Sequence, residues 1–133
     1  SVTLAELNAL DADSTQVSIA LSATSVADGA TIATEVQFKD AAGVALDHVV
    51  AFDWYISSVS TGLALDAAIT TVADGGAGAI TGVYTAHQSG KAVTDATGLC
   101  DLDLTEAGAD VIYLVVVSPD GRITVSGSMT FAA

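Results

Sequence analysis

Positive charge is scarce in this chain. Its basic side chains are Lys39, Lys91 and Arg122, against sixteen Asp and Glu, and the formal net charge is −13. Nucleic-acid binding depends on basic side chains that neutralise phosphates, and attraction to an anionic membrane surface depends on the same charges. The sequence therefore predicts neither a nucleic-acid partner nor a membrane partner. It does predict an acidic surface, which keeps the protein soluble.

Cysteine is also rare, with a single residue at position 100. Cys100 has no partner for an intrachain disulfide. It lies in the stretch GLCDLDLT, where strand alternation places it on one face with Leu102 and Leu104. We expect a buried apolar group and not a reactive thiol, since no basic residue is near it in the sequence.

Long apolar runs are missing. No stretch reaches the roughly 18 apolar residues that cross a bilayer as a helix. The opening SVTLAELNAL lacks the basic region and the apolar run of a signal peptide, which predicts synthesis in a host cytoplasm without export. Aromatic residues make up 5% of a chain that is 51% hydrophobic, so we expect a core of small side chains, mainly Ala and Val.

What the chain has in abundance is strand alternation broken by turns. In AFDWYIS the side chains of Phe52, Trp54 and Ile56 share one face, which predicts that Trp54 is a core residue. Seven or eight such strands, with a turn about every ten residues, predict an all-β sandwich. We assign residues 14–133 to this domain and residues 1–13 to an N-terminal arm or short helix.

The closing stretch, residues 111–131, predicts a hairpin with its turn at SPDG, residues 118–121. Its first arm, residues 111–117, is apolar on both faces, which indicates a central strand or one whose outer face is covered by a neighbouring protein. Its second arm alternates, so we expect its apolar side chains to face the core and its polar ones to face solvent. The apolar set is Ile123, Val125, Gly127, Met129 and Phe131, and the polar set is Arg122, Thr124, Ser126, Ser128 and Thr130.

Two strand-turn signatures resemble those of bacterial immunoglobulin-like domains of the invasin–intimin kind. A last strand, VSGSMTF, completes a resemblance that covers residues 16–131 and implies an immunoglobulin-like β-sandwich. Such signatures specify fold better than function. The matching positions are Val36, Phe38, Asp40, Gly43 and Leu46 in the first signature, and Thr94, Asp95, Gly98, Cys100, Leu102, Leu104 and Thr105 in the second.

The second half of the chain also resembles small immunoglobulin-like virion proteins of tailed bacteriophages, in DWYISSVSTGLAL and GLCDLDLTEAGADVIYLVVVSPDGRITVSG. This resemblance implies a non-enzymatic structural protein on the capsid surface of the virion, which decorates or cements the phage head. Its partners would be the major capsid protein or other virion subunits, with further copies of itself on the shell. The alternative is an exported bacterial cell-surface adhesion or surface-layer module that binds calcium.

No arrangement of residues predicts catalysis or a cofactor. His48 and His87 lack the spacing of a zinc helix, and GGAG at residues 75–78 is not followed by the lysine of a phosphate loop. Carboxylates remain as candidates because calcium prefers oxygen ligands, although local hydrogen bonds also explain Asp in turns. The candidate calcium ligands are Asp11, Asp13, Asp101 and Asp103, the last two pointing away from the core.

We expect contact with a partner at two places. The apolar side chains of Leu4, Leu7 and Leu10 in the N-terminal arm are candidates for docking on a neighbouring subunit. Tyr55 is the other candidate, because it lies opposite the core face of its strand and tyrosine is enriched at the energetic centres of interfaces. An open sandwich also leaves sheet edges with which a partner strand can pair.

Overall fold

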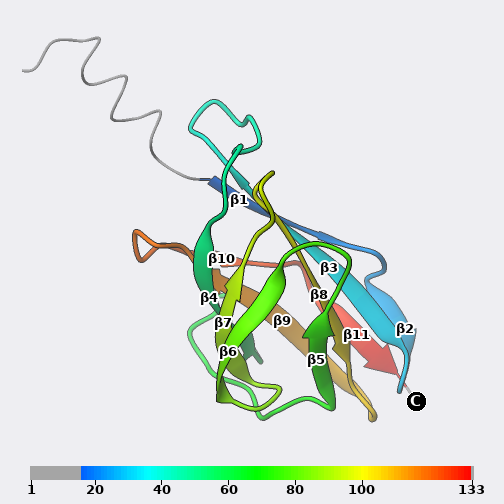
Figure 1. Ribbon diagram of the computed structural model, residues 1–133. Coiled ribbons are helices and arrows are strands. Elements are labelled where there is room, and N and C mark those ends of the chain that lie inside the picture. The colour runs from blue at the N-terminus through cyan, green and yellow to red at the C-terminus, as the bar shows by residue number, and fades with distance from the viewer. Residues whose placement is uncertain (1–15, 133) are drawn as a thin grey trace, which may run out of the picture.

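The computed structural model describes residues 16–132, and these form a two-layer β-sandwich (Figure 1). The predicted all-β class is confirmed, and no helix of the described residues is long and apolar enough to cross a membrane. The strands number eleven instead of seven or eight, because several are short. They are β1 (Gln16–Leu21), β2 (Ser25–Ala27), β3 (Thr31–Lys39), β4 (Ala51–Ser57), β5 (Thr71–Asp74), β6 (Ala79–Thr85), β7 (Ser89–Val93), β8 (Leu99–Thr105), β9 (Asp110–Val117), β10 (Ile123–Val125) and β11 (Met129–Ala132).

The two layers differ in size. The small sheet has the strand order β1-β3-β8-β5 and is antiparallel throughout. The large sheet has the order β2-β11-β9-β4-β7-β6, and β10 pairs with β9 beside β11. The chain passes from the small sheet to the large sheet at residues 75–78, between β5 and β6, and returns at residues 94–98, between β7 and β8. The β6–β7 hairpin therefore pairs with β4 in the large sheet, whereas β5 and β8 belong to the small sheet.

The core lies between the sheets and consists of the alternate, inward-facing residues. Trp54 is 1% exposed and Cys100 is fully buried, as predicted. The rings of Phe38 and Phe52 pack at a centroid distance of 5.3 Å. The expectation of a core mainly of Ala and Val holds for Val and is wrong for Ala: among the described residues Ala92 is the alanine of the core, and Ile, Leu and aromatic side chains join Val in supplying most of the rest. Larger side chains bury more apolar area per position, so they occupy the inward positions.

The C-terminal hairpin departs from simple alternation at one place. Val125 lies opposite Val115, and Met129 lies opposite Ile112. The step from Val125 to Met129 is one residue longer than the step from Val115 to Ile112 on the partner strand. Residues 126–128 therefore form a bulge that separates β10 from β11.

The bulge reverses the faces of the strand. Met129 and Phe131 are buried in the core as predicted, whereas Ile123 is 43% exposed on the outer face. Ser126, expected in solvent, is buried, and its hydroxyl accepts the N–H of Leu114. The prediction of one face for the whole arm is wrong because an extra residue in a strand exchanges inward and outward positions beyond it.

Candidate functional site

One end of the sandwich carries the first of the two signature turns. The Asp40 side chain accepts the backbone N–H groups of Ala42 and Val44. The Asp40 carbonyl accepts the N–H of Gly43, which has φ +82°, a conformation that glycine adopts without strain. Asp and Gly are thus required by the turn itself, which explains the first signature.

The second signature builds the same turn at Asp95. Its carboxylate accepts N–H groups from Thr97 and Leu99 and the hydroxyl of Thr97. Its carbonyl accepts the N–H of Gly98, which has φ +75°. The Thr97 hydroxyl bond and the N–H bonds lower the pKa of Asp95, because they stabilise the ionised form.

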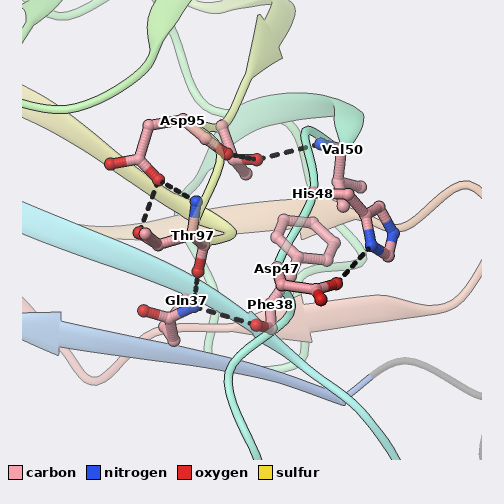
Figure 2. Close-up of polar contacts among 8 residues, drawn as sticks. Gln37, Phe38, Asp47, His48, Val50, Asp95 and Thr97 are labelled. Atoms are coloured by element: carbon pink, nitrogen blue, oxygen red, sulfur yellow. Dashed lines mark hydrogen bonds and ion pairs between the residues drawn. The ribbon is translucent and has the colours of Figure 1, made fainter.

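Polar side chains join the Asp95 turn and the residues next to it to neighbouring segments (Figure 2). The Gln37 amide donates to the carbonyls of Phe38 and Thr97, both at 2.9 Å. The Thr94 hydroxyl accepts the N–H of Val50. These side chains form hydrogen bonds with backbone groups of neighbouring segments, so they stabilise the fold at this end of the molecule.

The two histidines lie at opposite ends of the β4–β7 pair, and within residues 16–132 neither belongs to a group of side chains that could hold a metal ion. His48 is exposed beside Asp47, with 3.5 Å between Nδ1 and the carboxylate (Figure 2). His87 has φ +57°, and its ring Nδ1 accepts the N–H of Val72 while its carbonyl accepts that of Ile69. His87 therefore links the β6–β7 turn of the large sheet to β5 of the small sheet, a role that the sequence did not suggest.

The calcium candidates in β8 lie on the outer face of the small sheet. Asp101 and Asp103 alternate with buried Cys100 and Leu102, so they point away from the core as expected. Asp101 is not freely solvated: one carboxylate oxygen is buried without a partner among the described residues, and Gly75 packs so closely that a Cβ there would lie 2.4 Å from the Asp101 Cβ.

Across residues 16–132 no three His, Cys, Asp or Glu side chains gather as a metal ion would require. A flat sheet separates alternate carboxylates along a strand, whereas calcium needs six to eight oxygens around one point. Asp11 and Asp13, like Leu4, Leu7 and Leu10, lie outside the described residues, so their roles stay predictions.

Part of the outer face of the large sheet, around Val115 and Val125, is covered by the chain itself, at residues 57–66 from the end of β4 toward β5. The Tyr55 hydroxyl donates to the carbonyl of Gly62 at 2.5 Å. Gly62 packs on Val115 and Val125, since a Cβ at position 62 would lie 2.8 Å from Val125 Cγ2 and 3.2 Å from Val115 Cγ2. Val115 is fully buried although it faces away from the core.

This cover explains why β9 is apolar on both faces. The sequence suggested a neighbouring protein as the cover, and the structure supplies residues 57–66 instead. Tyr55, predicted as a partner contact, is half-buried and uses its hydroxyl within the fold. Leu63 and Leu65 in the cover are 80% and 58% exposed, so the covering segment now presents the apolar surface on this side.

A groove of about 390 Å³ lies beside this cover, between β4, β7 and the β9–β10 turn. Within its walls Lys91 Nζ lies 3.4 Å from the Asp53 carboxylate, which also accepts the Tyr84 hydroxyl. The pKa of Lys91 is raised, mostly by a hydrogen bond between Lys91 and Tyr84 and to a smaller extent by the negative charge of Asp53. The pairing of β4 with β7, which brings Lys91 opposite Asp53, has no sequence signature.

The outer face of the small sheet has no comparable cover within the described chain. Its middle rows bring Glu35 directly opposite Asp101, and Ala33 opposite Asp103. A hollow of about 180 Å³ lies next to Glu35. It is lined by Ala20, Leu21, Ser22, Ala33 and Glu35.

Cys100 is buried beneath this acidic face. Desolvation raises the pKa of its thiol to about 12, and the charges of Asp101 and Asp74 add to the effect. At neutral pH the thiolate that reacts with electrophiles is therefore negligible. The geometry agrees with the predicted role of Cys100 as a core residue.

No protein-family model and no curated protein sequence matches this chain. Among solved structures, the chain is similar to the adhesin InvE of Yersinia pseudotuberculosis, with a TM-score of 0.55 and 13% identity over 90% of this chain. The chain spans about a third of that adhesin, 32% of its length. A cohesin module from a Clostridium perfringens family 33 glycoside hydrolase superposes at a TM-score of 0.48 with 9% identity, over 90% of this chain and 98% of the module. The likeness to the adhesin shows the fold, and confirms that the all-β sandwich is immunoglobulin-like.

Proposed function

We propose that this chain is a non-enzymatic structural module that docks on a larger assembly, and that the assembly is the outer shell of a phage head. The observation that supports docking is the contrast between its two outer faces. The large sheet is covered around Val115 by residues 57–66, whereas the small sheet presents carboxylates without such a cover in the described chain, and a hollow beside an edge strand.

Docking of this kind would reinforce the shell by mass action. A protein that binds the assembled lattice but not the free subunits stabilises the lattice by the free energy of that binding. The major capsid protein is the proposed partner. Under this proposal the N-terminal leucines, Leu4, Leu7 and Leu10, add contacts to the same partner, so deletion of residues 1–10 weakens docking and leaves the melting temperature of the sandwich unchanged.

The second candidate is a cell-surface adhesion or surface-layer module of a bacterium. The similarity of the fold to the adhesin InvE favours it, as does the fact that the chain corresponds to only part of that adhesin's length. This candidate predicts further modules of the same kind beside it and location in the cell envelope.

Fractionation of the source culture on a density gradient separates the two candidates. We expect peptides of this chain to travel with intact virus particles, at many copies per particle by quantitative mass spectrometry. Recovery with cell envelopes and absence from particles would contradict the capsid role and favour the adhesion module. Purified particles stripped of the protein should then lose heat resistance and regain it when the protein is added back.

A further inference from the structure

The edge strand β1 offers a regular row of unpaired backbone groups. All six of its residues are in register with β3, and no strand of the described chain pairs with its other side. Just beyond the strand, Ser22 donates its N–H to the carbonyl of Ala33. Because bonding alternates along an antiparallel ladder, Ser18 and Ala20 bond to β3, and Val17 and Ile19 direct their N–H and C=O groups outward.

This edge lacks three common protections against pairing, although β10 of the large sheet comes close to part of β1 without pairing with it. Sheet edges are commonly blunted by charged side chains, proline or bulges, and QVSIAL contains none of these. One of the two outermost strands of the large sheet, β6, differs: its register with β7 shifts between Ile80 and Gly82 and again between Val83 and Thr85. Irregularities of this kind turn an edge away from regular pairing.

Acidic groups lie directly beside the open edge. Ala20 of β1 is opposite Glu35 of β3, which in turn is opposite Asp101 of β8. The hollow between Ala20 and Glu35 is floored by small side chains. On this face the next cation is Lys39, four residues from Glu35 along β3, which corresponds to roughly 13 Å in a strand.

We propose that β1 receives an extended segment of another protein, which pairs with Val17 and Ile19 and places a lysine or arginine side chain over the hollow next to Glu35. This inference rests on the proposed function and names the edge and the partner chemistry through which docking occurs. The apolar side chains of the incoming strand would cover Val17 and Ile19, which are half-buried. Main-chain bonds would give affinity, and the basic side chain would give specificity.

Charge complementarity selects this occupant over two others. A second copy of the chain brings three basic residues against sixteen acidic ones, so β1-to-β1 pairing would add carboxylates to an acidic face. The N-terminal residues 1–15 contain Glu6, Asp11 and Asp13 and no cation. A partner segment with basic side chains compensates Glu35 and Asp101, and neither of the other occupants does so.

Amide hydrogen exchange on the full chain alone is the first test. We expect fast exchange at Val17 and Ile19 and slow exchange at Ser18 and Ala20, since the latter pair bonds to β3. Slow exchange at Val17 and Ile19 in the monomeric protein would show that the chain covers its own edge and would overturn the proposal. Protection that grows with protein concentration, with dimers in sedimentation velocity, would assign the edge to a second copy and would overturn it as well.

The second test adds a probe strand, a capped peptide of about eight residues that alternates valine and lysine. We expect the peptide to protect Val17 and Ile19 from exchange. A peptide of the same composition with its lysines in one block should protect them at least tenfold less, and an alternating valine–glutamate peptide should not protect them. Equal protection by the block peptide, or none by the alternating one, would overturn the proposal.

Matched variants locate the site. Ala20→Lys fills the hollow and neutralises Glu35, so binding of the alternating valine–lysine peptide should weaken about tenfold. Ala86→Lys makes the same charge change at an exposed turn of the large sheet and should bind the peptide within twofold of the unchanged protein. Equal effects of the two variants would mean that the peptide senses only net charge, which contradicts the proposal.

The two proposals fail separately. If the chain travels with virus particles but the edge stays unpaired in the peptide experiment, the docking edge is wrong and the capsid role stands. If the edge binds the peptide but the chain is found in cell envelopes, the edge stands and the capsid role fails.

Discussion

The outer faces of the two sheets differ in whether the chain covers them. On the large sheet, residues 57–66 fold back over the outer face, and the fully buried Val115 lies beneath them. On the small sheet, the corresponding surface carries Glu35 opposite Asp101, with no covering segment among residues 16–132. The first face is apolar and covered around Val115, and the second carries carboxylates and has no such cover in the described chain.

The difference separates stability from interaction. Apolar area removed from water contributes roughly 25 cal/mol per Å², so the side chains beneath the cover add to the stability of the fold. Like charges directly opposite on a sheet oppose folding slightly, so the acidic face stabilises the fold less and keeps its capacity for a partner of opposite charge. Substitutions on the two faces should therefore differ in size and in sign.

The largest effect is expected from Gly62→Ala in the cover. Gly62 has φ +72°, and an added Cβ would lie 2.8 Å from Val125 Cγ2 and 3.2 Å from Val115 Cγ2. Backbone strain and overpacking together should lower the free energy of unfolding by about 2–4 kcal/mol. Urea denaturation followed by tryptophan fluorescence measures this change through the buried Trp54.

Gly43→Ala is the matched control for that prediction. Gly43 has φ +82° but nothing within 4 Å of an added Cβ. It should cost only the strain of the left-handed conformation, about 1–2 kcal/mol. An equal loss in both variants would show that Gly62 does not pack on the sheet and that the cover is loose.

The next effect is that of Val115→Ala beneath the cover. Removal of two methyl groups from a fully buried site should lower the free energy of unfolding by about 1.5–2.5 kcal/mol. Val111 is on the same strand and the same face but is 44% exposed, so Val111→Ala should cost less than about 0.5 kcal/mol. Similar losses at the two positions would contradict the closed face.

The sequence predicted that β9 is a central strand or that its outer face is covered, and it did not say what the cover is. A strand that is apolar on both faces needs apolar contact on both sides, and that requirement is visible in residues 111–117. The covering segment has no periodicity, because it is held by the hydroxyls of Tyr55 and Ser57, which donate to its carbonyls, and by the small size of Gly62. A neighbouring protein and a loop of the same chain are therefore indistinguishable from the pattern of β9 alone.

Turns were predictable and sheet order was not. Asp40 with Gly43, and Asp95 with Gly98, use side-chain and backbone bonds within a few residues, so the sequence carries the whole explanation. The open edge at β1 depends on which strands pair, and period-2 alternation contains no information about neighbours. The face switch at residues 126–128 was missed because one extra residue leaves both halves of the strand alternating normally.

A smaller effect is expected from Tyr55→Phe, which removes the hydroxyl that donates to the Gly62 carbonyl. The ring stays in place, so the loss should be that of one hydrogen bond, about 1 kcal/mol. Amide exchange should show the consequence locally, with faster exchange across residues 58–66 and no change in β3 or β8. A stability equal to that of the unchanged protein would show that the bond does not hold the cover.

The smallest effect, and the one of opposite sign, is expected on the open face. Glu35→Gln removes one of two carboxylates that oppose each other across β3 and β8, so it should raise the free energy of unfolding by about 0.2–0.5 kcal/mol at low salt. The gain should vanish in 1 M NaCl, where the screening length is about 3 Å. Asp28→Asn removes the same charge from an exposed turn and should raise the free energy of unfolding by less than half as much.

Urea denaturation of both variants at the two salt concentrations measures the difference. An increase in the free energy of unfolding that persists in high salt would mean that Glu35 is unfavourable for a reason other than repulsion. Repulsion that salt removes is also repulsion that a basic side chain would remove, so this measurement connects the stability of the open face to its capacity for a cationic partner.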